Sequence, residues 1–221
     1  MKLRKIFGIL RAGAEFIFYD PRFLMISLIY FGILIIFPSL GNTLILKIIG
    51  LIFLAIYMSY LIPSVKLYAQ KTRPKPLTSI NISSTFPHLL GFQSLLFLIN
   101  ELMYLMSLFN PARDVLRITW ALILIFIYLT FLTPVIICLK KEKWWRAVGN
   151  SAEFVIKHLF PTILFYSILM LLSYILSPPT FYVRGKIFRY LNLFRWLTHS
   201  LWFVFYPATI TLFWIESRRR R

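Results

Sequence analysis

The sequence of 221 residues contains little cysteine, little acid and little charge of any kind. Cys138 is the only cysteine, which excludes an internal disulfide and a cysteine-based metal cluster. Seven acidic residues leave few candidates for acid–base catalysis, and no catalytic residue is identified. A glycine-rich phosphate loop and a Gly-x-Ser-x-Gly motif are absent, and His88, His158 and His199 lie far apart. We therefore expect no cofactor, no bound metal and a function other than catalysis.

Long apolar runs are the main feature that is present. Hydrophobic residues make up 59% of the chain and charged residues 14%, against about half and about a quarter in soluble domains. A soluble domain could not bury so much apolar surface, whereas a bilayer removes that need. Six uncharged runs are near or above the length of a spanning helix, about 18 residues. They are Phe23–Leu46, Ile48–Val65, Pro76–Asn100, Ile118–Leu139, Leu159–Val183 and Trp196–Ile215.

Prolines group these runs into three pairs. An opening and a closing proline bound each pair: Pro21 with Pro63, Pro87 with Pro134, and Pro161 with Pro207. The repeats cover about residues 12–65, 78–139 and 150–216 of a single transmembrane domain. The predicted fold class is all-α, a polytopic membrane protein with six transmembrane helices in three tandem helical hairpins and with interfacial amphipathic helices.

Three stretches between the apolar runs have the spacing of amphipathic helices lying in the membrane plane. They are Met1–Phe18, Lys143–Lys157 and Ser177–Arg195. The last apolar segment, 197–215, is expected to cross the membrane, and a re-entrant segment kinked by Pro207 is the alternative.

The net charge of +18 would suggest nucleic acid in a soluble chain, but here the basic residues lie between apolar runs. Basic residues in that position set orientation and meet anionic lipid head groups. We therefore predict no nucleic-acid partner and a bilayer with anionic lipids. Most basic residues fall on one side if both termini are cytoplasmic, which favours that orientation. The plasma (inner) membrane is the preferred location, and an organelle inner membrane stays open.

We expect a basic segment after the second apolar run and a tryptophan pair further along the chain to contact lipid head groups. The side chains concerned are Lys66, Lys71, Arg73, Lys75, Trp144 and Trp145. The spacing from Lys66 to Arg73-Pro74 also resembles the first signature of lipid-phosphate phosphatases. That family needs two further histidine-containing motifs, Pro-Ser-Gly-His and Ser-Arg-x5-His-x3-Asp, and this chain has neither.

Glu101 is the one acidic residue well inside a predicted span, where a charge costs about 2.5–3.5 kcal/mol. It should therefore have a partner or be protonated. We predict an intramembrane polar cluster in which Glu101 contacts Lys47, Arg195 or His199. The candidate members are Glu101, Asn100, Lys47, His199 and Arg195. A buried ion pair, an ion- or proton-coupled pathway and a Glu101 that snorkels to the surface are the three interpretations.

The stretch from Phe131 to Leu172 has a span that ends in proline, a short basic segment, two tryptophans, a small-residue helix and a second span. It resembles prokaryotic YciC-like proteins and the membrane domain attached to some glycerophosphodiester phosphodiesterases. The resemblance implies a helical membrane domain and supplies no catalytic residues.

These features favour a non-enzymatic multi-pass integral membrane protein that acts as a scaffold or as an accessory subunit of a membrane complex or transport pathway. Membrane-protein subunits are its expected partners. A membrane-embedded enzyme acting on lipid head groups and a stand-alone transporter are the alternatives.

Overall fold

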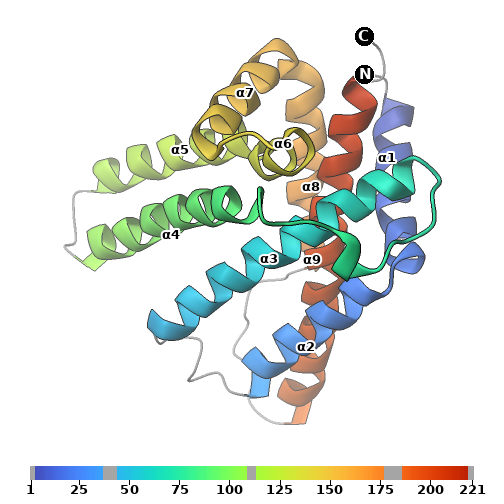
Figure 1. The fold of residues 1–221 in the computed structure, drawn as a ribbon. Coiled ribbons are helices and arrows are strands. Elements are labelled where there is room, and N and C mark those ends of the chain that lie inside the picture. Colours follow the sequence, from blue (N-terminus) through green and yellow to red (C-terminus); the bar gives the residue numbers. More distant parts are fainter. Residues whose placement is uncertain (1–2, 37–43, 109–112, 177–185, 219–221) are drawn as a thin grey trace.

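The computed structural model describes residues 3–36, 44–108, 113–176 and 186–218, and these form helices joined by short connections (Figure 1). No strand occurs in these ranges, so the all-α prediction is confirmed for the described chain. The helices are α1 (Leu3–Tyr19), α2 (Arg22–Ile36), α3 (Leu44–Ala69), η2 (Leu77–Ser79), α4 (Phe86–Leu108), α5 (Arg113–Thr130), α6 (Thr133–Lys140), α7 (Trp144–Lys157), α8 (Leu159–Leu176) and α9 (Lys186–Arg218).

Three helical stretches are long and apolar enough to cross a membrane, or up to five if each of two bent helix pairs counts as one span. The three are Lys47–Ala69 in α3, Phe86–Met106 in α4, and Asp114–Lys140 across α5 and α6. The bent pairs are α1 with α2, at 84°, and α7 with α8, at 105°. These helices support a membrane protein, whereas six spans in hairpins stay a prediction.

Prolines account for three of the helix breaks, although Pro63 and Pro207 lie inside the continuous helices α3 and α9. A proline ring clashes with the carbonyl four residues earlier and supplies no N–H to it. Thr130 lies four residues before Pro134 and is the last residue of α5. Lys157 lies four residues before Pro161 and is the last residue of α7. Pro21 lies in the bend between α1 and α2.

The last helix differs from its prediction. α9 runs without a break from Lys186 to Arg218 and is 33 residues long, about 50 Å at 1.5 Å per residue. The expectation of a separate interfacial helix over Ser177–Arg195 is therefore wrong from Lys186 onward, and residues 177–185 lie outside the described chain. Residues of α9 such as Thr198, Thr209 and Thr211 are buried against other helices. Because protein covers much of α9, this helix tolerates polar residues that a lipid-facing span would not.

Several helix pairings join segments that belong to different predicted repeats. α4 of the second repeat packs on α3 of the first, and α2 of the first packs on α9 of the third. α8 of the third repeat contacts α5 of the second, because the Tyr128 hydroxyl lies 2.8 Å from that of Thr162. Each of the three predicted repeats therefore contacts the other two, and the first meets the third where α2 and α3 pack on α9 (Figure 1).

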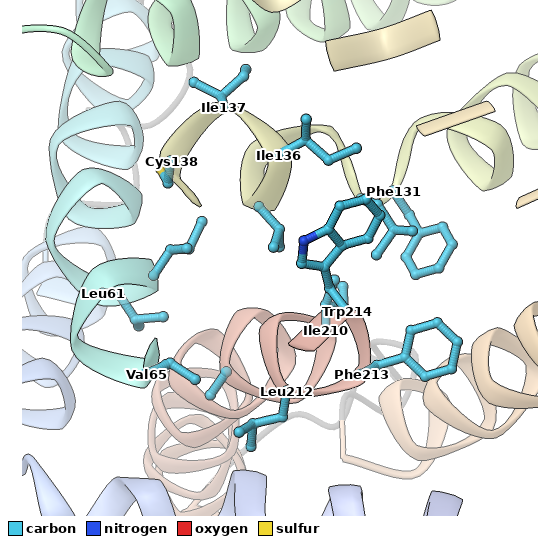
Figure 2. Packing of buried hydrophobic residues seen from close by; sticks show 14 of the residues in the cluster. Leu61, Val65, Phe131, Ile136, Ile137, Cys138, Ile210, Leu212, Phe213 and Trp214 are labelled. Carbon is cyan, nitrogen blue, oxygen red and sulfur yellow. The ribbon is translucent and has the colours of Figure 1, made fainter. Parts of the chain in front are cut away.

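The helices that carry the three closing prolines meet in the core. Leu61 and Val65 of α3, Ile136 of α6, and Ile210 and Phe213 of α9 are buried in one cluster (Figure 2). The rings of Phe165 and Phe213 stack with their centroids 4.1 Å apart and join α8 to this core. The core thus lies around the helices that contain Pro63, Pro134 and Pro207.

The amphipathic helices α1 and α7 lie within two residues of the predicted ranges Met1–Phe18 and Lys143–Lys157. Protein covers much of each apolar stripe, although Phe7 and Phe18 of α1 and Ile156 of α7 are exposed, so the position of these helices along the bilayer surface stays a prediction. The stripe of α1 packs on α9 and that of α7 on α5 and α6, because these neighbours offer complementary apolar surface. The buried residues are Ile6, Ile9, Phe16 and Ile17 in α1, and Ala147, Ser151 and Val155 in α7.

Candidate functional site

An ion pair joins α3 to α4 inside two of the candidate spans. Lys47 Nζ lies 2.7 Å from Glu101 Oε1, and it also lies 6.0 Å from the centre of the Phe97 ring. The side chains of Lys47 and Glu101 are 37% and 27% exposed. The predicted contact between Glu101 and Lys47 is therefore present. Its role, as a structural pair or as part of a pathway, stays a prediction.

The other members of the predicted polar cluster occupy different settings. Asn100 is exposed. The His199 ring lies 6.0 Å from the Phe31 ring in an edge-on contact, which places it against α2. The Arg195 side chain lies outside the described part of the chain.

The bend between α1 and α2 contains a polar contact that the sequence analysis missed. Asp20 is 1% exposed and accepts two hydrogen bonds from Arg22, each 2.7 Å long, through Nε and Nη2. A bidentate pair of this kind fixes both side chains, so it stabilises the bend at Pro21. We call Tyr19, Asp20, Pro21 and Arg22 the elbow. An acid and an arginine on either side of a proline were the available signal in the sequence.

The elbow holds the backbone of the loop 70–76, which connects α3 to η2. Arg22 Nη2 donates to the carbonyl oxygen of Lys75 over 2.9 Å, and the Tyr19 hydroxyl donates to the carbonyl oxygen of Thr72. The Thr72 hydroxyl in turn donates to the Leu67 carbonyl at the end of α3 over 2.8 Å. Two points of the loop backbone are thereby fixed to the start of α2 and the end of α1.

A second set of contacts supports the same corner from α1 and α3. The Tyr68 hydroxyl donates to Glu15 Oε2 over 3.1 Å, and Arg11 Nε donates to Glu15 Oε1 over 2.8 Å. The rings of Tyr19 and Tyr68 lie 5.0 Å apart. The acidic groups that these contacts bring to the corner, Glu15 and Asp20, are therefore each paired with an arginine of their own.

The predicted head-group residues of this segment are all on the surface. Lys66, Lys71, Arg73 and Lys75 are exposed. Lys71 has a φ of 57°, in the left-handed region, which turns the chain sharply after α3. The structure therefore presents four basic side chains from one segment whose backbone is held.

The two tryptophans have different surroundings. Trp144 packs against Gly91 of α4 so closely that a Cβ added there would lie 3.0 Å from its ring. Trp145 is 51% exposed, with Lys143 Nζ 5.3 Å from its ring and the His88 ring 6.2 Å away. Trp145 is thus open to a head-group contact, whereas Trp144 is partly enclosed between helices.

The connection between α6 and α7 is fastened through one carboxylate. Glu142 pairs with Lys140 at 3.1 Å and accepts a hydrogen bond from the amide of Asn150. Lys141 has a φ of 55° at the end of α6. Glu142 thereby links the loop to the polar face of α7.

Polar and aromatic side chains also fasten α2, α3 and α9 to one another. The hydroxyls of Ser27 and Tyr57 lie 3.0 Å apart, and Trp196 Nε1 donates to the Leu28 carbonyl over 2.7 Å. The indole of Trp196 lies beside Gly32, where an added Cβ would be at an ordinary van der Waals distance of 3.5 Å from Nε1. The polar groups of Ser27, Tyr57 and Trp196 therefore join helices to one another.

Within the described residues, no group of three histidine, cysteine, aspartate or glutamate side chains could hold a metal ion. Comparison of the chain with protein-family models, with curated proteins and with solved structures gave no match. The function is therefore argued from the geometry alone.

Proposed function

We propose that this chain is a non-enzymatic multi-pass membrane protein that serves as a scaffold or accessory subunit of a membrane complex or transport pathway. The observation that carries the proposal is how its polar side chains are used. Lys47 and Glu101 join α3 to α4, Ser27 and Tyr57 join α2 to α3, and Trp196 joins α9 to α2. These polar groups link helices in pairs, as structural contacts in a membrane protein do.

The exposed apolar surface supports the same proposal. Large apolar side chains are exposed along α2, α3, α4, α5 and α8, where a bilayer or the helices of a partner subunit would cover them. α4 and α5 extend away from the core and carry many of these side chains (Figure 1). They include Leu98, Leu102, Leu105, Ile118, Leu122 and Ile125.

The proposal includes six spans in three hairpins, both termini in the cytoplasm, and the plasma membrane as location. α9 would be the sixth span, and its enclosure by α1, α2 and α3 supports this assignment despite its buried threonines. The exposed basic segment Lys66–Lys75 would then face the cytoplasm, in agreement with the positive-inside rule.

Cysteine accessibility tests this orientation. In a Cys138→Ala background, which suits the buried site of Cys138, we expect Lys71→Cys to be labelled only after the membrane is opened. Asp114→Cys, at the exposed start of α5, should be labelled in intact cells or spheroplasts. Labelling of both positions from one side would contradict the proposed topology.

Purification in a mild detergent tests the scaffold role. We expect the tagged chain to elute with a partner protein in a fixed molar ratio, and the chain to be lost from membranes of cells that lack this partner. A chain that elutes alone, with an activity on lipid that single substitutions between Lys66 and Lys75 abolish, would favour the lipid enzyme instead.

A further inference from the structure

We propose that the elbow and the loop 70–76 together form a binding site for the phosphate of an anionic phospholipid head group. The inference rests on the membrane location in the proposed function and is independent of the scaffold role. It concerns three side chains, Lys71, Arg73 and Lys75, and the contacts that hold the loop carrying them.

The backbone of the loop is ordered before any ligand arrives. The Tyr19 hydroxyl donates a hydrogen bond to the Thr72 carbonyl, and Arg22 donates one to the Lys75 carbonyl. Because these two carbonyls are turned toward the elbow, the loop has a fixed position while its basic side chains stay exposed. Binding to a held loop costs less conformational entropy than ordering a free loop.

The charge of this surface is not neutralised by the protein. Asp20 is paired with Arg22, and Glu15 is paired with Arg11. Among the described residues, no carboxylate pairs with Lys71, Arg73 or Lys75. Arginine and lysine are the side chains that recognise phosphate, through bidentate hydrogen bonds and as point charges respectively. Three such cations within five residues exceed the single negative charge of one phospholipid phosphodiester, so they can attract it without help from other residues.

An exposed aromatic ring that directly precedes Tyr19 in the chain points to a lipid as the source of the phosphate. Phe18 is 85% exposed and directly precedes Tyr19, whose hydroxyl holds the loop. Phe7, three helical turns earlier on α1, is also exposed. An apolar ring next to a cationic loop suits a surface where acyl chains and phosphates meet, because the ring enters the apolar layer while the cations stay at the phosphates. A soluble phosphate compound has no acyl chain, so it would gain nothing from contact with these rings.

Lipid titration of the full chain, purified in a neutral detergent, tests the proposal. Short-chain phosphatidylglycerol is the probe, phosphatidylcholine the neutral control, and retained lipid is measured by native mass spectrometry. The triple variant Lys71→Gln, Arg73→Gln, Lys75→Gln should bind phosphatidylglycerol at least tenfold more weakly, since each cation near an anionic surface contributes about 1 kcal/mol. Its thermal unfolding temperature is recorded to show that the variant is folded.

Two matched variants separate a built site from general attraction to negative charge. The triple variant Lys141→Gln, Lys143→Gln, Arg146→Gln removes the same charge from another exposed segment and should change binding by less than about twofold. Tyr19→Phe removes one hydroxyl, keeps every charge and releases the Thr72 carbonyl. It should weaken binding about two- to tenfold, the effect of one lost hydrogen bond of about 0.5–1.5 kcal/mol.

The outcomes that would overturn the proposal are distinct. Equal losses in the two triple variants would indicate diffuse attraction only, and unchanged binding by Tyr19→Phe would show that the held loop is irrelevant. Displacement of the lipid by inorganic phosphate at equal concentration would identify a soluble anion site instead. None of these results would alter co-purification with a partner, so failure of this inference and failure of the scaffold role are distinguishable.

Discussion

The crossing of α1 and α9 gives a prediction whose size follows from the structure. A Cβ added at Gly13 would lie 2.2 Å from Thr209 Oγ1, 3.2 Å from Thr209 Cβ and 3.4 Å from Phe205 Cε2. Thr209 is buried, and its hydroxyl donates to the Phe205 carbonyl over 2.7 Å, so α1 must move outward or that bond must break. Overpacking of this kind costs about 1–3 kcal/mol, against a gain of about 0.5–1 kcal/mol for replacing a helical glycine by alanine. We expect Gly13→Ala to lose a net free energy of unfolding of about 1–2 kcal/mol.

Thermal unfolding of the purified protein, followed by tryptophan fluorescence, measures this effect. A loss of that size lowers the Tm by about 2–8 °C in a chain of this length. Gly8→Ala on the same helix is the matched control, because nothing lies within 4 Å of the added Cβ, and it should leave the Tm equal or raised. Adding Thr209→Ala to Gly13→Ala should recover most of the loss, since it removes the clashing hydroxyl. Equal Tm values for Gly8→Ala and Gly13→Ala would refute the close crossing of α1 and α9.

Three further substitutions test single contacts by the same measurement. Glu101→Gln should lower the Tm less than Glu101→Leu, because the amide oxygen of glutamine still accepts a hydrogen bond from Lys47. Leucine instead leaves the partly buried Lys47 ammonium unpaired. The reverse order of Tm values would argue against the ion pair. Asn150→Asp should destabilise the protein by about 1 kcal/mol, because it places a second carboxylate beside Glu142. An unchanged Tm at neutral pH would contradict the contact between Asn150 and Glu142. Val155→Asp should be worse, at about 3 kcal/mol or more, because Val155 is fully buried.

The sequence predicted element types better than it predicted what covers them. The charge spacing of Lys143–Lys157 located α7 to within one residue, because helical periodicity is a local property. The same periodicity could not show whether Val155 faces lipid or protein, since both are apolar. Asn150 illustrates the limit on the polar face, where tolerance of a charge depends on Glu142, eight residues earlier in the chain.

Depth in the membrane was the most useful long-range argument. It brought Lys47 and Glu101 together because a charge within a span needs a partner at its own level, which the structure contains. Apolar runs were less reliable for helix ends. The run Phe23–Leu46 contains all but the first residue of α2 (Arg22–Ile36) and also the start of α3 at Leu44. The contacts of the elbow could not be predicted from the sequence, because hydrogen bonds to the Thr72 and Lys75 carbonyls depend on the course of the backbone.

The packing of α2 on α9 has a consequence for biosynthesis. α2 packs on α9, yet about 150 residues separate the end of α2 from the start of α9. At about 5–20 residues per second, a ribosome needs roughly 7–30 s to make that interval. During this time the Leu28 carbonyl lacks Trp196, and the faces of α1 and α2 that α9 will cover are open to lipid or to insertion factors. The contacts of α9 with α1 and α2 therefore form last, and nascent chains interrupted before α9 expose to quality-control proteases a surface that the finished protein hides.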